Sequence, residues 1–191
     1  MENFDWDKLD LGEIETNKPN FNKVVTPLLD KFQAIPFTEE ELEPLNKFVE
    51  DVVIEKLNES HYKVDSGSLK KRYQTGFMGE MAISKILEKN TVDWAIGNSK
   101  IFNKSDLSAL GKNVGIKTVE WGKFPIVHKN PKRPEIICIR KENTVYVFSL
   151  ATIAAMQEYS SDELIKSQEL RARNVKTGFY GFEQLKQLKK K

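Results

Sequence analysis

The chain has 191 residues, of which 39% are hydrophobic and 30% are charged, and its formal net charge is +2. This length allows a substantial hydrophobic core, and no apolar run approaches the roughly 20 residues of a membrane span. A single cysteine, Cys138, excludes a disulfide framework and a cysteine-based zinc site within one chain. The acidic N-terminus lacks the features of a signal or transit peptide, so we expect a cytoplasmic protein without a membrane partner.

Charge is distributed unevenly along the sequence. Residues 1–60 hold 15 acidic and 6 basic side chains, whereas residues 61–191 hold 13 acidic and 24 basic side chains. A basic body favours a polyanionic partner such as a nucleic acid, with a solvated surface of uneven charge as the alternative. We therefore divide the chain into an acidic N-terminal extension with its helix, residues 1–60, and an α/β core with C-terminal helices, residues 61–191.

The first third of the chain predicts an extension followed by two long helices. Residues 1–37 carry short apolar pieces separated by prolines, which indicates a segment that lies on the body or pairs with a partner. Thr38 and Glu41 have the spacing of a capping box and start a helix over about 39–58. Apolar spacing predicts a second helix over about 68–89, whose internal glycines permit close approach to a sheet.

The remainder of the chain predicts strands followed by helices. Together with the preceding helices, this order implies a mixed sheet of four or five strands flanked by helices, an α/β fold with an N-terminal extension. A turn at 111–113 is expected to join the second and third strands as a hairpin. The expected strands are 92–97, 103–110, 114–119, 135–140 and 144–150, and the expected helices are 151–159, 160–173 and a terminal one after 180.

Three charged residues in this part of the chain stand out as candidates for chemistry. Glu80 lies on or beside the apolar stripe of the second helix, unless it reaches water at the edge of the stripe. Asp106 belongs to a strand-like segment, where aspartate is depleted, and Lys117 belongs to an apolar strand. Each alone is more typical of a turn or an exposed face, but the expected hairpin would bring Asp106 and Lys117 together.

A helix packed on that hairpin would add the Glu80 carboxylate to the cluster. Two carboxylates suit Mg²⁺, which prefers hard oxygen ligands and keeps several of its waters. A lysine beside them can orient a water molecule or neutralise the charge that grows on a phosphate. The combination is typical of metal-assisted phosphodiester hydrolysis.

The pattern of Glu80 on a helix, Asp106 on a strand and Lys117 on the next strand resembles the PD-(D/E)XK nuclease superfamily. The resemblance covers about residues 66–158 and implies the restriction-endonuclease-like fold. It implies Mg²⁺, with Mn²⁺ as a substitute, held by Glu80, Asp106 and the main-chain carbonyl of Ile116, while Lys117 positions the attacking water. DNA is the implied substrate, and a homodimer is expected because one such site handles one strand. A restriction, repair, recombination or phage role would each fit.

One position departs from the family pattern. Gly115 stands where the family carries its second acid. Glu80 could supply the missing carboxylate, whereas Glu120 is an odd number of residues from Lys117 and therefore faces the other side of the strand unless a bulge intervenes. The alternative is a fold that binds nucleic acid and has lost catalysis.

The loop over 120–135 mixes basic and aromatic side chains, which contact phosphates and stack on unpaired bases, respectively. Its alternative is a solvated connection whose aromatic residues pack inward. Lys70, Lys71 and Arg72 are less favoured phosphate contacts, because cations at the start of a helix oppose its dipole. The expected DNA contacts are Lys123, His128, Lys129, Lys132, Arg133, Arg171 and Arg173.

These observations favour a Mg²⁺-dependent DNA endonuclease. Two alternatives stay open from the sequence. One is a non-catalytic nucleic-acid-binding protein on the same fold, and the other is an interaction or inhibitor protein that acts through its acidic N-terminal segment.

Overall fold

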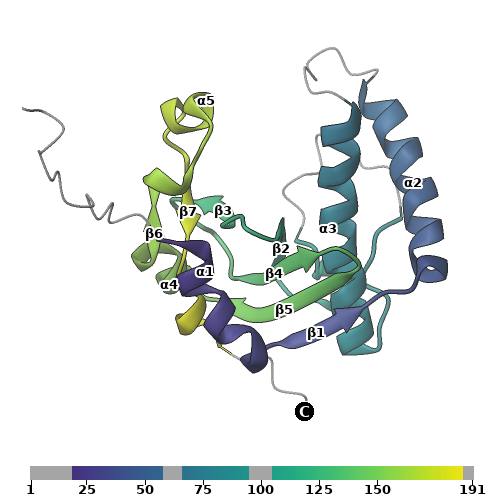
Figure 1. Ribbon diagram of the computed structural model, residues 1–191, viewed down its shortest axis with the longest axis horizontal. Coiled ribbons are helices and arrows are strands. Elements are labelled where there is room, and N and C mark those ends of the chain that lie inside the picture. Colours follow the sequence, from purple (N-terminus) through teal and green to yellow (C-terminus); the bar gives the residue numbers. More distant parts are fainter. Residues whose placement is uncertain (1–18, 58–65, 95–104, 187–191) are drawn as a thin grey trace, which may run out of the picture.

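The computed structural model describes residues 19–57, 66–94 and 105–186 (Figure 1). Its centre is a mixed four-stranded sheet in the order β1-β5-β4-β2, which confirms the expected mixed sheet with helices. Strand β4 is antiparallel to β5 and parallel to β2. Strand β2 is last in the order and is therefore an edge strand. The strands are β1 (Gln33–Pro36), β2 (Gly115–Glu120), β4 (Glu135–Lys141) and β5 (Thr144–Ala151).

A second, smaller sheet has the strand order β3-β7-β6. It lies at the end of the large sheet away from the long helices, together with the short helix α5 (Figure 1). Its strands are β3 (Ile126–His128), β6 (Ser160–Ser161) and β7 (Lys176–Phe179), and α5 covers Gln168–Ala172.

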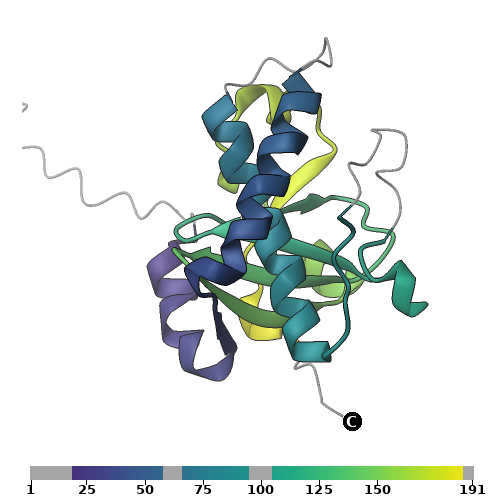
Figure 2. The ribbon, with the colours of Figure 1, turned by 90° about the vertical axis from the view of Figure 1, so that its right-hand side faces the viewer.

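Two long helices, α2 (Glu39–Leu57) and α3 (Ser66–Leu87), cover one face of the large sheet (Figures 1 and 2). The predicted capping box starts α2, because the Thr38 backbone N–H donates to Glu41 Oε2 at 2.9 Å and the Glu41 N–H donates to Thr38 Oγ1 at 3.2 Å. Apolar side chains of both helices form one core with alternate residues of the central strands, including Ile136 and Cys138. Burial raises the pKa of the Cys138 thiol to about 12, as expected for a core residue.

Helix α3 approaches β2 unusually closely, at Gly79. A Cβ atom at this position would lie 1.7 Å from Thr118 Oγ1, a separation that no side chain can adopt. Gly76, one turn earlier, has no atom within 4 Å of the corresponding position. The close approach expected from the helix glycines therefore occurs at one of them, and it fixes α3 against β2.

Residues 19–37 of the predicted extension lie on the body, which was one of its two predicted alternatives, while residues 1–18 lie outside the described residues. Strand β1 pairs antiparallel with β5, with Ile35 opposite Val145. Before it, helix α1 (Phe21–Val24) and the 3-10 helix η2 (Thr26–Lys31) pack on the other face of the sheet. A second core forms there with alternate strand residues, including Ile137 and Phe148.

The three strands with strong apolar patterns, 114–119, 135–140 and 144–150, are confirmed, as is helix α4 (Ile153–Glu158). The strand expected over 103–110 is wrong for its described part, because residues 105–107 form a turn that leads into the 3-10 helix η4 (Ser108–Leu110). In the strand expected over 92–97, residues 92–94 adopt no strand, and the rest lies outside the described residues.

The helix expected over 160–173 is also wrong. The Ser160 hydroxyl donates to the Met156 carbonyl at 2.6 Å, while Ser161 and Ser167 cap two separate short helices, η5 (Asp162–Leu164) and α5. Burial of Leu164 against Gly178 of β7 outweighs the tendency to form one continuous helix. Of the helix expected after residue 180, the described part up to residue 186 contains the short 3-10 helix η6 (Phe182–Gln184). Residues 187–191 lie outside the described residues.

Candidate functional site

Asp106 is fixed at the free edge of β2. Its Oδ2 atom accepts a 2.5 Å hydrogen bond from the Ile116 backbone N–H, which points away from β4. The turn that carries Asp106 is closed by a hydrogen bond from the Ser105 hydroxyl to the Lys112 carbonyl at 2.9 Å. The structure therefore brings Asp106 to β2 as expected, although a tight turn does so in place of a strand ladder.

Glu80 approaches the same edge from helix α3. The pKa of Glu80 is raised to about 8, first by burial and then by the negative charges of Asp106 and Asp93. A carboxyl group with this pKa holds its proton at neutral pH, because ionisation would add a charge to an acidic, poorly hydrated place. A bound cation would reverse that preference.

Lys117 extends from β2 on the face opposite α3. Ile116 packs against the core of α2 and α3, and Thr118 contacts Gly79, so the alternation of a strand turns Lys117 the other way. Burial lowers the pKa of Lys117, and the charge of Glu135 opposes this shift. Asp106 also opposes it, so Asp106 is coupled both to Glu80 and to Lys117.

Glu135 is a residue of this site that the sequence analysis did not find. It is the first residue of β4 and lies opposite Gly115 in the parallel ladder. A Cβ atom built on Gly115 would lie 3.4 Å from Glu135 Cγ, 3.5 Å from Asp106 Oδ2 and 3.2 Å from Arg133 Nε. The small space left by the missing side chain is thus bordered by two carboxylate side chains and one guanidinium group.

The other acid considered near Lys117, Glu120, is engaged elsewhere. It forms ion pairs with Lys71 at 2.9 Å and with Lys123 at 2.5 Å. Burial alone would raise the pKa of Glu120, but these two cations lower it. It faces α3, as its odd separation from Lys117 predicted.

Several of the expected DNA contacts bind other parts of the protein. Lys129 binds Asp162 and Asn174, each at 2.6 Å, and so ties β3 to the segment around β7. Arg171 donates to the Ile165 and Glu163 carbonyls at 2.6 and 3.0 Å, while Lys123 binds Glu120 as described above. Lys132 and Arg173 are exposed.

Two of the expected contacts, Arg133 and His128, lie close to the candidate site. Arg133 borders the space at Gly115. Burial lowers the pKa of His128, as do the charges of Lys176, Lys117 and Arg133, while Glu135 raises it. His128 on β3 is paired in register with Lys176 on β7.

Two further cations act on Lys117 from different sides of the site. The positive charges of Lys176 on β7 and of Arg72 on α3 both lower the pKa of Lys117. Lys70 and Lys71, which precede Arg72 in the sequence, bind Glu50 and Glu120, respectively. Arg72 is therefore the member of this basic run whose charge acts on Lys117.

The aromatic residues of the loop over 120–135 pack inward, which was the alternative to base stacking. Phe21 of helix α1 makes edge contacts with Trp121 and Phe124, with ring centroids 5.2 and 5.7 Å apart. The amino group of Lys141 lies 4.9 Å from the centre of the Trp121 ring. These rings therefore join the extension to the body.

Among the described residues, no three His, Cys, Asp or Glu side chains converge closely enough to hold a metal ion. Mg²⁺ is commonly held by only one or two carboxylates, with waters and substrate phosphates completing its shell. The carboxylates that could hold such an ion are therefore Asp106 and one acidic neighbour, either Glu80 or Glu135.

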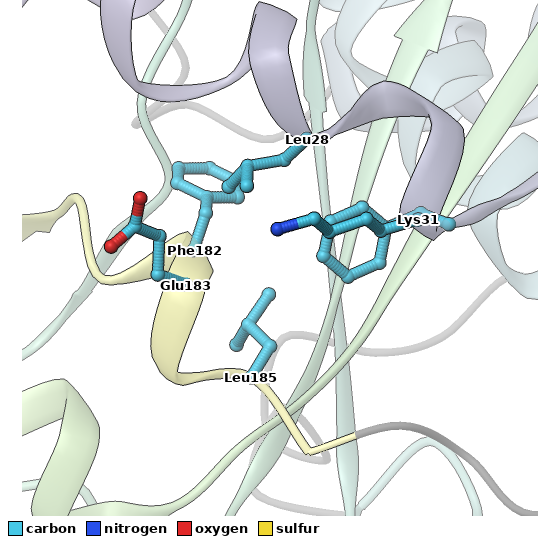
Figure 3. Close-up of a pocket in the computed structure, with 6 residues that line it drawn as sticks. Leu28, Lys31, Phe182, Glu183 and Leu185 are labelled. Atoms are coloured by element: carbon cyan, nitrogen blue, oxygen red, sulfur yellow. The ribbon is translucent and has the colours of Figure 1, made fainter.

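A pocket elsewhere in the protein shares no residue with this site. It lies between η2 and η6, where the Lys31 amino group points into the space between Leu28, Phe182 and Leu185 (Figure 3). It is lined by Leu28, Lys31, Phe32, Phe182, Glu183 and Leu185.

Comparison of the chain with protein-family models, with curated proteins and with solved structures found no match. None of the helices in the described ranges has the length and apolar character needed to cross a membrane.

Proposed function

We propose that the protein is a Mg²⁺-dependent DNA endonuclease that hydrolyses phosphodiester bonds at the free edge of β2. The observation that carries this proposal is the position of Asp106. Its carboxylate is hydrogen-bonded to Ile116, lies close enough to Glu80 to raise its pKa, and acts electrostatically on the partly buried Lys117. Carboxylates gathered beside a lysine with a lowered pKa form a site suited to binding a cation and a phosphate together.

The residues present fit a divalent cation. Glu80 keeps its proton because it is buried and because Asp106 and Asp93 add negative charge beside it, and Glu135 Oε2 is buried without a hydrogen-bond partner. Asp106, Glu80 and the Ile116 carbonyl would hold the ion. The carbonyl faces the free edge because the N–H and C=O of one strand residue point to the same side. When bound, Mg²⁺ polarises a phosphoryl oxygen and lowers the pKa of a bound water.

The remaining steps belong to side chains of the protein. Lys117 is suited to orient the attacking water and to neutralise the charge that grows on the phosphate. Arg72 and Lys176 supply positive charge from α3 and β7, and they would hold the phosphate backbone against Lys117. Asp106 keeps its orientation through the Ile116 N–H, so the site requires no large rearrangement of this carboxylate.

Cleavage of supercoiled plasmid, linear duplex and single-stranded DNA in Mg²⁺ tests the proposal. We expect wild-type cleavage that EDTA stops, and loss of cleavage in Asp106→Asn and Lys117→Met. Glu183→Gln and Lys31→Gln, both from the pocket of Figure 3, are matched controls that retain activity. Unchanged cutting by Asp106→Asn and Lys117→Met would refute this site.

The non-catalytic alternative is favoured by two observations, namely Gly115 at the second-acid position and the lack of three converging ligands in the described part. Under that alternative, DNA would bind without metal-dependent cleavage, and its affinity would fall steeply with salt. The proposed homodimer is tested separately, by measuring the molar mass of the protein in solution by light scattering, with and without DNA.

A further inference from the structure

We propose that Glu135 of β4 is the second acid of the site, and that it takes across the sheet the place which Gly115 leaves open on β2. The inference rests on the proposed function, because it concerns the same metal site. It assigns a ligand to a strand on which the sequence pattern placed none.

The register of the sheet puts Glu135 on the required face. Gly115 and Glu135 are opposite each other in the parallel ladder, as are Lys117 and Ile137. Residues paired in this way share a face, and Ile137 belongs to the core on the side of the sheet opposite α3. Glu135 and Lys117 therefore project on the same side of the sheet, whereas Glu80 comes from the α3 side.

The space at Gly115 is where the two acids meet. Glu135 Cγ and Asp106 Oδ2 both lie within 3.5 Å of the position that a Gly115 Cβ would occupy. A longer residue on β2 would compete with Glu135 for this space. Glycine on β2 and glutamate on β4 thus form a complementary pair, in which the absence of one side chain admits the other.

One oxygen of Glu135 needs a partner from outside the protein. Oε2 is fully buried and receives no hydrogen bond. Buried carboxylate oxygens are normally satisfied, so a specific exception indicates an ion or a water at that point. Asp106 before β2 and Arg133 before β4 share with Glu135 the border of the Gly115 position. Glu135 also acts electrostatically on Lys117 of β2 and His128 of β3, and both of these feel the charge of Lys176 on β7.

The neighbouring basic groups do not replace such an ion. Arg133 Nε lies 3.2 Å from the Gly115 position, and its guanidinium balances charge there while Glu135 Oε2 stays without a donor. Glu135 together with Asp106 offers two hard oxygen donors on the face of Lys117, which is the set that Mg²⁺ or Mn²⁺ takes. Under this assignment Glu135 takes the ligand position given above to Glu80, and the Glu80 carboxyl is a neighbour of the pair on the other side of Asp106.

Direct Mn²⁺ binding tests this assignment without any DNA. Free Mn²⁺ is measured by its electron paramagnetic resonance signal, with Mg²⁺ as competitor, for wild type, Glu135→Ala and Glu135→Gln. We expect each variant to weaken Mn²⁺ binding by at least about tenfold, since loss of even an outer-shell partner commonly has this effect. Glu120→Gln on β2 is the matched control and should bind Mn²⁺ as the wild type does, because Glu120 faces α3.

A second-site exchange tests whether Glu135 occupies the place of a residue at 115. Glu135→Ala removes the Cγ atom that lies 3.4 Å from the Gly115 position, and the backbone at Gly115 does not have a positive φ. The nearest remaining atom is Arg133 Nε at 3.2 Å, part of a long side chain that needs to shift by a few tenths of an ångström to admit an aspartate. Gly115→Asp combined with Glu135→Ala should recover Mn²⁺ binding and DNA cleavage, while Gly115→Asp alone should weaken both through crowding.

The outcomes separate this inference from the proposed function. Wild-type affinity for Mn²⁺ in folded Glu135→Gln would overturn the inference, even if the wild-type protein cleaves DNA. Weakened binding in both Glu135 variants without rescue by Gly115→Asp would also count against it, provided that circular dichroism shows the double variant folded. If the double variant does not fold, the Mn²⁺ affinity of Glu135→Gln alone decides whether Glu135 is a ligand. Loss and rescue of Mn²⁺ binding in a protein that cleaves no DNA would support the metal pair and refute the nuclease.

Discussion

Glu80 makes the stability of the protein depend on pH in a way that one substitution should remove. Its pKa is raised from 4.5 to about 8, first by burial and then by Asp106 and Asp93. The folded state therefore favours the neutral carboxyl. Its stabilising contribution is complete below pH 4.5 and is lost as the pH rises toward and through 8.

The two pKa values set the size of the effect. Relative to acidic solution, they correspond to a loss of about 3 kcal/mol at pH 7 and of about 5 kcal/mol well above pH 8. Glu80→Gln keeps the shape of the neutral acid and cannot ionise. Its stability relative to the wild type should therefore grow by about 3 to 4 kcal/mol between about pH 5 and about pH 8.

Urea unfolding followed by circular dichroism measures this difference across the pH range. Glu183→Gln, which changes an exposed carboxylate, should give a profile parallel to that of the wild type. Added Mg²⁺ should flatten the wild-type profile and leave that of Glu80→Gln less affected, because a bound cation favours ionised Glu80. Parallel profiles for wild type and Glu80→Gln would show that Glu80 is not held neutral by its surroundings.

Further substitutions test the packing of α3 and the cationic groups. Gly79→Ala should destabilise the protein by about 1 to 3 kcal/mol in urea unfolding, because its Cβ would lie 1.7 Å from a threonine hydroxyl of β2. Gly76→Ala, with nothing within 4 Å, should stabilise the helix by up to about 1 kcal/mol, and equal effects of the two would contradict the close approach. Arg72→Ala and Lys176→Ala should each weaken DNA binding and reduce the slope of log K against log salt by about 1. Lys166→Ala, an exposed lysine, should leave that slope unchanged, and a slope equally unchanged in the first two would remove them from the DNA path.

The parts of the fold that could be predicted are those with strong local patterns. Helix α2 starts at the expected capping box, and β2, β4 and β5 follow the apolar runs. The strand predicted around Asp106 is replaced by a turn and the 3-10 helix η4. This turn depends on closure by Ser105 and on the left-handed Gly111, which ends η4 with φ 66°. Such closure outweighs the weak strand pattern of a short segment.

The candidate site was only partly predictable for a related reason. The sequence spacing identified Asp106 and Lys117, because a short turn forces residues near it in the chain to be near in space. Glu135 depends on a parallel register between β2 and β4, which the chain between the two strands does not specify. A charged residue at the head of an otherwise buried strand was the available signal. Arg72 and Lys176 come from elements far apart in the sequence, so only the fold unites them.

The central claim is that Asp106 and Lys117 form a metal-dependent phosphodiester site. Its most direct test is the cleavage rate of duplex and single-stranded DNA in Mg²⁺, compared among wild type, Asp106→Asn and Lys117→Met. The account predicts cleavage by the wild type that EDTA abolishes, and a loss of about 100-fold or more in both variants, because Asp106→Asn removes a metal ligand and Lys117→Met removes the charge that stabilises the transition state. Cleavage that survives EDTA, or that both variants retain at the wild-type rate, would contradict the account.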